Sequence, residues 1–416
     1  MRTEYQGVVT RFLQQDERLI LSEEHEMPLV IEANNATDIE FLQQFLISNS
    51  RQIIEDMAHY GAVLLRGFDI NTDEQFEKVV LSIPEFRGIS EAFMSENGRV
   101  HVDNLQFVLH TNSVYKTGGT LYLGGFHSEN YYSTDVPSYL CFCCFQPSEL
   151  GGETGLINTQ KIYSHLHDDL KQKLENNSFF VCKWSVAEIA ERYQITHDAV
   201  KIICQKFNLP IVGEGEEQFV YMYKPSVWEH PLTQEKALQI NMFELPTLNY
   251  ELRKCFMDDY KGPVWFWHRF FWRLPTSMFN LVELLAIGCI SFFNSPKNAY
   301  KIVRTKLSNF KASRKSKCLP AKTAKVGSCF SDKEVKDLAQ LMRNYYSSCL
   351  WKKGDVLLID NKKVMHAGMP GKGARLVRAM ICNPLDMSYA SEKGVLVAKE
   401  QTSDTIGACM VERTMN

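Results

Sequence analysis

The 416-residue sequence lacks a strong net charge, and it lacks a hydrophobic stretch at its beginning. Its 46 basic and 49 acidic side chains leave a formal net charge of −3, so the overall charge does not indicate binding to nucleic acid. Residues 1–17, MRTEYQGVVTRFLQQDE, mix apolar and charged types and contain no apolar core of a secretion signal. The chain nevertheless carries 12 cysteines. Many cysteines without a secretion signal indicate a reducing compartment, and we therefore expect a cytoplasmic protein.

Internal repeats of 20 to 50 residues are also absent, which argues against a solenoid or a propeller. Hydrophobic periodicity predicts helices over residues 36–61, 72–83, 158–176 and 332–349. We expect one strand at each of 62–70, 354–368 and 375–384 and an extended segment at 218–231. Residues 100–145 are rich in β-branched and aromatic side chains, and we expect strands and loops there. Cys141, Cys143 and Cys144 lie in one of the apolar runs, where packing in the core is the expected role.

Several histidines stand two residues before another possible metal ligand. A non-haem iron site uses two histidines and one carboxylate and leaves other positions on the metal open. Residues i and i+2 share a face of a strand, but in a helix they point about 200° apart. The pattern occurs at His101/Asp103, His127/Glu129, His165/His167 and His167/Asp169. The last two pairs fall in the expected helix 158–176 and are disfavoured, whereas spacing alone leaves the first two open.

Four blocks of sequence, in a fixed order, distinguish His127/Glu129 from the other pairs. They are GAVLLRGF (61–68), FHSENYY (126–132), GGETGLINTQKIY (151–163) and GDVLLIDNKKVMHAG…RLVRAMI (354–381). Together they resemble the taurine dioxygenase/clavaminate synthase-like family of Fe(II)- and 2-oxoglutarate-dependent oxygenases. The resemblance implies one oxygenase domain over residues 1–416, with an α+β fold. It also implies a double-stranded β-helix (jelly-roll) core with flanking helices.

Carried over residue by residue, the resemblance implies an iron site made by His127, Glu129 and His366. Fe(II) would be the cofactor, and 2-oxoglutarate and O2 the co-substrates. The expected reaction is hydroxylation of a small molecule such as an amino acid derivative or a secondary metabolite, with succinate and CO2 as co-products. Desaturation or cyclisation at the same site is an alternative. A non-catalytic binding protein and a zinc hydrolase with the same ligands are two further alternatives.

The same resemblance implies that Thr154 and an arginine hold the far carboxylate of 2-oxoglutarate. The candidates are Arg375 and Arg378, nine and twelve residues after His366. On a regular strand they face opposite sides, so one of them can point inward. The spacing favours Arg378, with Arg375 as the second choice. Asp360 is a further possible ligand, although it ends an apolar strand and can instead cap a turn.

Residues 263–331 depart from the family pattern. They begin with a dense aromatic and aliphatic run, and from Leu284 to Ser331 there is no acidic residue. We expect an inserted helical subdomain at about 250–345. Its segment 263–331 has three open interpretations: a lid over the site, a peripheral membrane contact or a contact with a partner protein. A membrane span is disfavoured because no second apolar segment would return the chain before His366.

Overall fold

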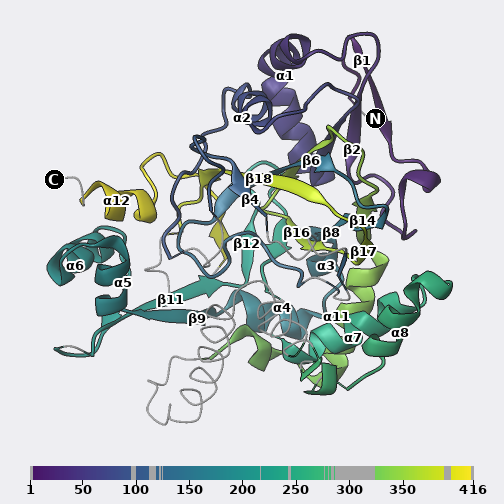
Figure 1. Cartoon of the computed structure of the whole chain (residues 1–416). Coiled ribbons are helices and arrows are strands. Elements are labelled where there is room, and N and C mark those ends of the chain that lie inside the picture. The colour runs from purple at the N-terminus through teal and green to yellow at the C-terminus, as the bar shows by residue number, and fades with distance from the viewer. Residues whose placement is uncertain are drawn as a thin grey trace.

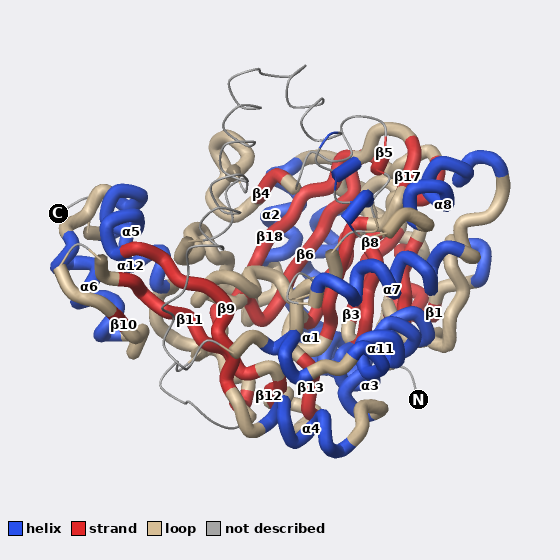
Figure 2. The backbone as a smooth tube through the Cα atoms, turned by 90° about the horizontal axis from the view of Figure 1, so that it is seen from below, coloured by secondary structure: helices blue, strands red, loops and turns tan. Residues whose placement is uncertain are grey.

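The computed structural model describes residues 3–94, 100–111, 119–120, 123, 125–215, 217–241, 245–275, 277–279, 281–282, 285, 324–387 and 395–413. Figures 1 and 2 show the chain from two directions, with strands at the centre and helices around them. The helices of this part of the chain are α1 (Ile39–Tyr60), α2 (Asp73–Leu81), α3 (Thr159–Ser164), α4 (Asp168–Glu175), α5 (Val186–Tyr193), α6 (His197–Lys206), α7 (Pro246–Met257), α8 (Phe266–Trp272), α11 (Asp332–Asn344) and α12 (Ile406–Glu412).

The largest sheet has seven strands. Their order is β1 (Val8–Phe12), β2 (Leu29–Ala33), β3 (Ala62–Arg66), β15 (Val356–Asp360), β6 (Pro137–Gln146), β18 (Leu376–Pro384) and β4 (Leu109–His110). Neighbouring strands are antiparallel except β2 and β3. A smaller antiparallel sheet has the order β14 (Tyr346–Cys349), β8 (Thr154–Asn158) and β16 (Val364–Gly368).

Three further sheets have three strands each. One has the order β5 (Gly119–Thr120), β17 (Gly371–Lys372) and β7 (Leu150–Gly151). The second has the order β10 (Ile211–Val212), β11 (Phe219–Pro225) and β9 (Ser178–Ser185). The third has the order β13 (Lys236–Leu238), β12 (Val227–Glu229) and β19 (Leu396–Val397).

The core is layered because the seven-stranded sheet and the β14–β8–β16 sheet are both apolar on their two faces. One apolar cluster joins the seven-stranded sheet to the β14–β8–β16 sheet, through side chains such as Phe142, Val377, Leu156 and Val364. A second cluster packs α1 and α2 on the opposite face of the large sheet. A third packs α3, α4, α7 and α11 on the outer face of the small sheet. The order is therefore helices, large sheet, small sheet, helices.

Local sequence signals account for the ends of the first two helices. Asp38 caps α1 by accepting a hydrogen bond of 2.8 Å from the backbone N–H of Phe41. The helix ends at Gly61, whose φ of 87° lies in the left-handed region that glycine adopts without strain. Thr72 and Gln75 form a capping box at the start of α2. The predicted helices at 36–61 and 72–83 are confirmed.

Three expected elements differ from the structure. The helix predicted at 158–176 is two helices, because the chain breaks between Ser164 and Asp168. The helix predicted at 332–349 ends at Asn344, and β14 follows it. Residues 354–368 form two strands, because Asp360 turns the chain by accepting hydrogen bonds from the backbone N–H groups of Lys362 and Lys363. That turn moves β16 from the large sheet to the small one.

The region expected to be an inserted subdomain is helical where the structure describes it. It contains most of α7, a short 3-10 helix at Pro263–Trp265, α8 and α11, and α7 packs against α11. Residues 286–323 lie outside the described residues. Among the helices that the structure describes, none is both long and apolar enough to cross a bilayer.

Candidate metal centre

His127 and His366 lie opposite each other on adjacent stretches of backbone. They form an antiparallel β-bridge and exchange both backbone hydrogen bonds, at 3.1 Å and 3.0 Å. His366 lies on β16, so the bridge adds His127 to the free edge of the small sheet beside that strand. The two imidazole rings are 4.5 Å apart between centroids. The bridge therefore fixes two possible ligands next to each other although they are far apart in the sequence.

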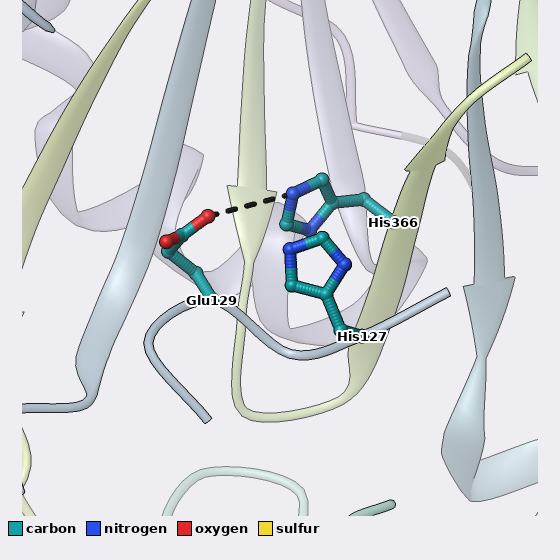
Figure 3. Close-up of side chains that lie close together, drawn as sticks. All are labelled: His127, Glu129 and His366. Atoms are coloured by element: carbon teal, nitrogen blue, oxygen red, sulfur yellow. Dashed lines mark ion pairs between the residues drawn. The ribbon is translucent and has the colours of Figure 1, made fainter. Parts of the chain in front are cut away.

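Glu129 completes the group. One nitrogen or oxygen atom from each of His127, Glu129 and His366 lies within 4.8 Å of the others. The His366 Nε2 atom is 3.5 Å from a carboxylate oxygen of Glu129 (Figure 3). Glu129 and His366 are buried, and His127 is partly exposed. Among the described residues this is the one cluster of three or more His, Cys, Asp or Glu side chains with such a spacing.

The chemistry of these donors fits a divalent iron ion. The Nδ1 atom of His127 is 2.7 Å from the carbonyl oxygen of Gly125. A carbonyl oxygen can only accept a hydrogen bond, so Nδ1 carries the proton and the Nε2 lone pair is left for a metal. Such a contact also orients a ligand ring. Two neutral imidazoles and one carboxylate on one side of an ion are typical of non-haem iron(II) oxygenases.

Thr154 lies on the same face of the small sheet as His366. In the register of β8 and β16, His366 is opposite Leu156, and Gly368 is opposite Thr154. Since side chains two positions apart on a strand share a face, Thr154 and His366 both point into the space between the two sheets. Phe142 of the large sheet borders the same space, and its ring centroid is 5.4 Å from that of His366.

Arg375 lies close to Thr154. Its Nη1 atom donates hydrogen bonds to the carbonyl oxygens of Gly152 and, at 3.5 Å, Glu153. Burial raises the pKa of Cys144, and the positive charge of Arg375 acts to lower it. The Cys144 side chain belongs to the cluster between the two sheets. Arg375 is also two positions before Val377, whose side chain belongs to the same cluster. The guanidinium group is therefore on the side of the large sheet that faces the small sheet.

Arg378 points the other way. It pairs with Cys143 in the sheet, and Cys143 belongs to the cluster beneath α1 and α2. Its Nε atom donates a hydrogen bond of 2.9 Å to Asp73, the first residue of α2. The preference for Arg378 came from its spacing after His366, and the geometry does not support it. The two arginines do face opposite sides of the sheet, as expected for a regular strand.

The other candidate ligands lie elsewhere. The Nε2 atom of His101 forms a hydrogen bond of 2.7 Å with the carbonyl oxygen of Ser90. His165 and His167 end α3 and begin α4, and neither belongs to the three-residue group. Asp360 is buried against His230 at 2.8 Å and Lys362 at 2.9 Å. Burial alone would raise the pKa of Asp360, but these two partners hold it below its ordinary value. Asp360 therefore stabilises the turn before β16.

Asn361 belongs to the candidate site but could not be identified from the sequence. Its side-chain oxygen accepts a hydrogen bond of 2.7 Å from the backbone N–H of Glu129. Its side-chain nitrogen donates to the carbonyl oxygen of Pro137 at 2.8 Å. Because Asn361 lies in the turn between β15 and β16, it ties the loop that carries Glu129 to the strand that carries His366. An asparagine directly after an apolar strand was a turn signal, but its partner could not be inferred.

Glu153 is a buried carboxyl group on the opposite face of β8 from Thr154. One of its oxygens accepts a hydrogen bond of 3.4 Å from the hydroxyl of Tyr346. The other has no hydrogen-bond partner among the described residues. Burial raises the pKa of Glu153 to about 7, and the Tyr346 hydrogen bond and the charge of Arg375 oppose this only in part. The carboxyl is thus a group whose charge state changes near neutral pH.

Taken together, the fold and the three donors define a mononuclear non-haem iron enzyme. Residues 27–380 match the model of the family described as taurine catabolism dioxygenase TauD, TfdA family. The match spans most of the chain, so the protein belongs to this family of Fe(II)/2-oxoglutarate-dependent oxygenases. The predicted family, enzyme class and cofactors are confirmed.

Two curated proteins are distant relatives. The clavaminate synthase-like protein At3g21360 of Arabidopsis thaliana is 22% identical over 358 residues, which is 81% of this chain and 86% of that protein. The dapdiamide synthesis protein DdaC of Enterobacter agglomerans is 22% identical over 217 residues, 49% of this chain and 62% of DdaC. This chain thus spans less than two thirds of the length of DdaC.

The chain is also similar to solved structures. A taurine dioxygenase from Burkholderia xenovorans has a TM-score of 0.45 and 12% identity, with coverage of 97% of this chain and 99% of that one. PvcB, an Fe, alpha-ketoglutarate dependent oxygenase, has a TM-score of 0.44 and 11% identity, covering 92% and 93%.

Proposed function

We propose that this oxygenase hydroxylates a small molecule such as an amino acid derivative or a secondary metabolite, and that succinate and CO2 are its co-products. The observation that carries the proposal is the convergence of His127, Glu129 and His366 in the space between the two sheets. Two sheets that enclose a metal site agree with a jelly-roll core, which we propose for the β-strands.

The three donors would hold iron(II) through His127 Nε2, His366 Nε2 and the Glu129 carboxylate. The oxidant is O2, which iron(II) would activate when bound, and 2-oxoglutarate would supply two of the four electrons as it is oxidised to succinate and CO2. The work of the protein is to hold these groups and to limit the access of water. Phe142 packs against the His366 ring and belongs to the apolar cluster between the sheets, so it shields one side of the site.

For the far carboxylate of 2-oxoglutarate we propose Arg375 and Thr154. A guanidinium group binds a carboxylate with two parallel hydrogen bonds, and a threonine hydroxyl adds a third. Arg375 is supported by its contacts with Gly152 and Glu153, which directly precede Thr154. Arg378 is a poor candidate because its guanidinium group already donates hydrogen bonds to the carboxylate of Asp73.

The substrate class is supported by one relative. The name of DdaC refers to dapdiamide synthesis, and this fits a role in the synthesis of a small molecule. Glu129 would give the metal a carboxylate ligand from the protein. Such a ligand favours hydroxylation and related oxidations over halogenation.

The proposal is tested with protein purified without oxygen, supplied with Fe(II) and 2-oxoglutarate, and then exposed to O2 with pools of amino acid derivatives. We expect succinate to form in step with an oxidised product, identified by a mass increase of one oxygen atom. A His127→Ala variant is the control. Succinate at the level of that control with every pool would contradict hydroxylation of this substrate class.

A further inference from the structure

The loop that carries Glu129 treats the two oxygens of this carboxylate differently. The backbone N–H of Asn130 donates a hydrogen bond of 3.1 Å to Glu129 Oε1. Glu129 Oε2 is the oxygen that lies 3.5 Å from His366 Nε2 (Figure 3). Asn130 has a φ of 54°, in the left-handed region that asparagine adopts more readily than most residues. The direction of the carboxylate therefore depends on the backbone of the loop at Asn130.

A buried lysine holds the backbone of this loop. Lys224 lies on β11, and its Nζ atom donates hydrogen bonds to the carbonyl oxygen of Asn130, at 3.3 Å, and to that of Tyr131. Burial lowers the pKa of Lys224 to about 7, so its place in the interior costs free energy that these hydrogen bonds offset. The two carbonyl groups belong to the two residues that follow Glu129. Lys224 therefore ties the loop to the β10–β11–β9 sheet.

A buried glutamine holds the loop on the other side of Glu129. Ser128 stands between the two candidate ligands of the loop, and its hydroxyl donates a hydrogen bond of 2.6 Å to Gln239 Oε1. Gln239 Nε2 in turn donates to the carbonyl oxygen of Lys362 at 2.9 Å. Gln239 directly follows β13, and Lys362 lies in the turn that leads into β16. The loop is therefore held before Glu129 by Gln239 and after it by Lys224.

We propose that Lys224 and Gln239 are positioning residues that keep Oε2 of Glu129 directed toward His366, where it can bind a metal. The inference rests on the proposed function, because it takes Glu129 as an iron ligand. Both residues act through the loop: Lys224 through two backbone carbonyl groups, and Gln239 through the hydroxyl of Ser128. A ligand that is held in place before the ion arrives loses less conformational freedom on binding, so groups that orient ligands raise metal affinity.

A second buried lysine separates a positioning role from a purely structural one. Lys363 also donates hydrogen bonds to two successive carbonyl oxygens, those of Ala58 at 2.8 Å and His59 at 3.2 Å. Burial lowers the pKa of Lys363 as well. These acceptors lie in α1, which packs on the opposite face of the large sheet. Loss of the Lys363 amine should therefore destabilise the fold without releasing the loop that carries Glu129.

Anaerobic titration of the metal-free full chain with Co(II) tests the proposal. Co(II) replaces Fe(II) as the probe because its visible absorption bands report the arrangement of its ligands. We expect Lys224→Met and Gln239→Leu each to raise the dissociation constant of Co(II) by about 10-fold or more and to change these bands. Lys224→Arg keeps hydrogen-bond donors at the end of a long side chain and should recover part of the affinity.

Each variant has a matched control. Lys363→Met is expected to lower stability in urea but to keep the Co(II) affinity and absorption bands of the unchanged protein. Gln160→Leu is the control for Gln239→Leu, since Gln160 is also buried and donates a hydrogen bond of 2.9 Å to Thr233. Circular dichroism verifies the fold of every variant. If Lys224→Met does not fold, the comparison of Gln239→Leu with Gln160→Leu decides the outcome.

A Glu129→Ala variant separates this inference from the proposed function. If the unchanged protein binds no Co(II), or binds it equally after Glu129→Ala, Glu129 is not a ligand and both the proposed function and this inference fail. If Glu129→Ala loses Co(II) while Lys224→Met and Gln239→Leu bind it like the unchanged protein, the positioning role alone is overturned. Equal losses of affinity in Lys224→Met and Lys363→Met would also overturn that role, because they would reflect stability alone.

Discussion

His127 and His366 exchange two backbone hydrogen bonds, which places their imidazole rings 4.5 Å apart between centroids. The spacing of these two candidate metal ligands is thus set by the backbone of the small sheet and not by flexible side-chain contacts. Pre-ordered donors bind a metal more tightly because less conformational freedom is lost when the ion arrives. The loop carrying Glu129 then adds the third ligand, held in place by Asn361.

Removing a ligand should abolish metal binding. We expect His127→Ala, Glu129→Ala and His366→Ala each to lose Fe(II) in anaerobic equilibrium dialysis, since two donors rarely hold this ion. His165→Ala is a suitable control, because His165 is exposed and hydrogen-bonded to Lys161 and Tyr345. Retention of stoichiometric iron by all three ligand variants would show that the metal binds elsewhere.

The two arginines should behave differently. Charged hydrogen bonds contribute about 1.5–3 kcal/mol each, so Arg375→Gln should raise the dissociation constant of 2-oxoglutarate by roughly 10- to 100-fold. Arg378→Gln should leave that constant unchanged and lower the free energy of unfolding by about 1 kcal/mol, since it breaks the ion pair with Asp73. Calorimetric titration and urea denaturation measure the two effects. The reverse pattern would assign the carboxylate to Arg378.

Asn361→Ala should weaken iron binding without removing a ligand. The substitution leaves the buried backbone N–H of Glu129 without its acceptor, at a cost of about 1–3 kcal/mol. Groups that orient a ligand typically contribute 10- to 100-fold in metal affinity. We therefore expect a dissociation constant for Fe(II) raised by roughly that factor, while circular dichroism verifies the fold. An unchanged metal affinity would mean that Asn361 serves the turn alone.

Glu153 should make stability depend on pH. Its pKa is about 7 in the folded protein and 4.5 when exposed, so between these values the folded state keeps a proton that the unfolded state has lost. The free energy of unfolding therefore falls as pH rises from about 4.5 to 7, by up to roughly 3 kcal/mol from this one group. Glu153→Gln should remove this part of the fall.

The comparison requires urea denaturation of both proteins at pH 5 and pH 8. Asp135 also has a raised pKa, of about 6, because it is buried, but it is present in both proteins and cancels in the difference. If the unchanged protein and the variant lose equal stability between the two pH values, Glu153 is not the group responsible.

The three candidate iron ligands could be identified in the sequence because they lie in short blocks with strong local patterns. His127, Glu129 and His366 each occur in such a block, and the structure brings all three together. The helix at 36–61 has a stop signal in Gly61 and the helix at 72–83 has a start signal in Thr72, and both helices were predicted. Helical character in the described part of 250–345 also followed from composition, whereas its interpretation as an inserted subdomain stays a prediction.

Other features depend on contacts between distant residues. The choice between Arg375 and Arg378 depends on which face of β18 packs against the small sheet, and that face is defined by contacts with side chains such as Leu156 and Val364. The turn at Asn361–Lys363 is stabilised by Asp360, which in turn needs His230 from another part of the chain. The role of Asn361 follows from a loop more than two hundred positions away. No local pattern encodes such partners.

The central claim is that His127, Glu129 and His366 hold an iron(II) ion beside which 2-oxoglutarate binds. Anaerobic calorimetric titration of 2-oxoglutarate into the protein, with and without Fe(II), tests it most directly. We predict saturable one-to-one binding that requires Fe(II) and is lost in Glu129→Ala. Binding of equal strength without the metal, or in that variant, would contradict the account.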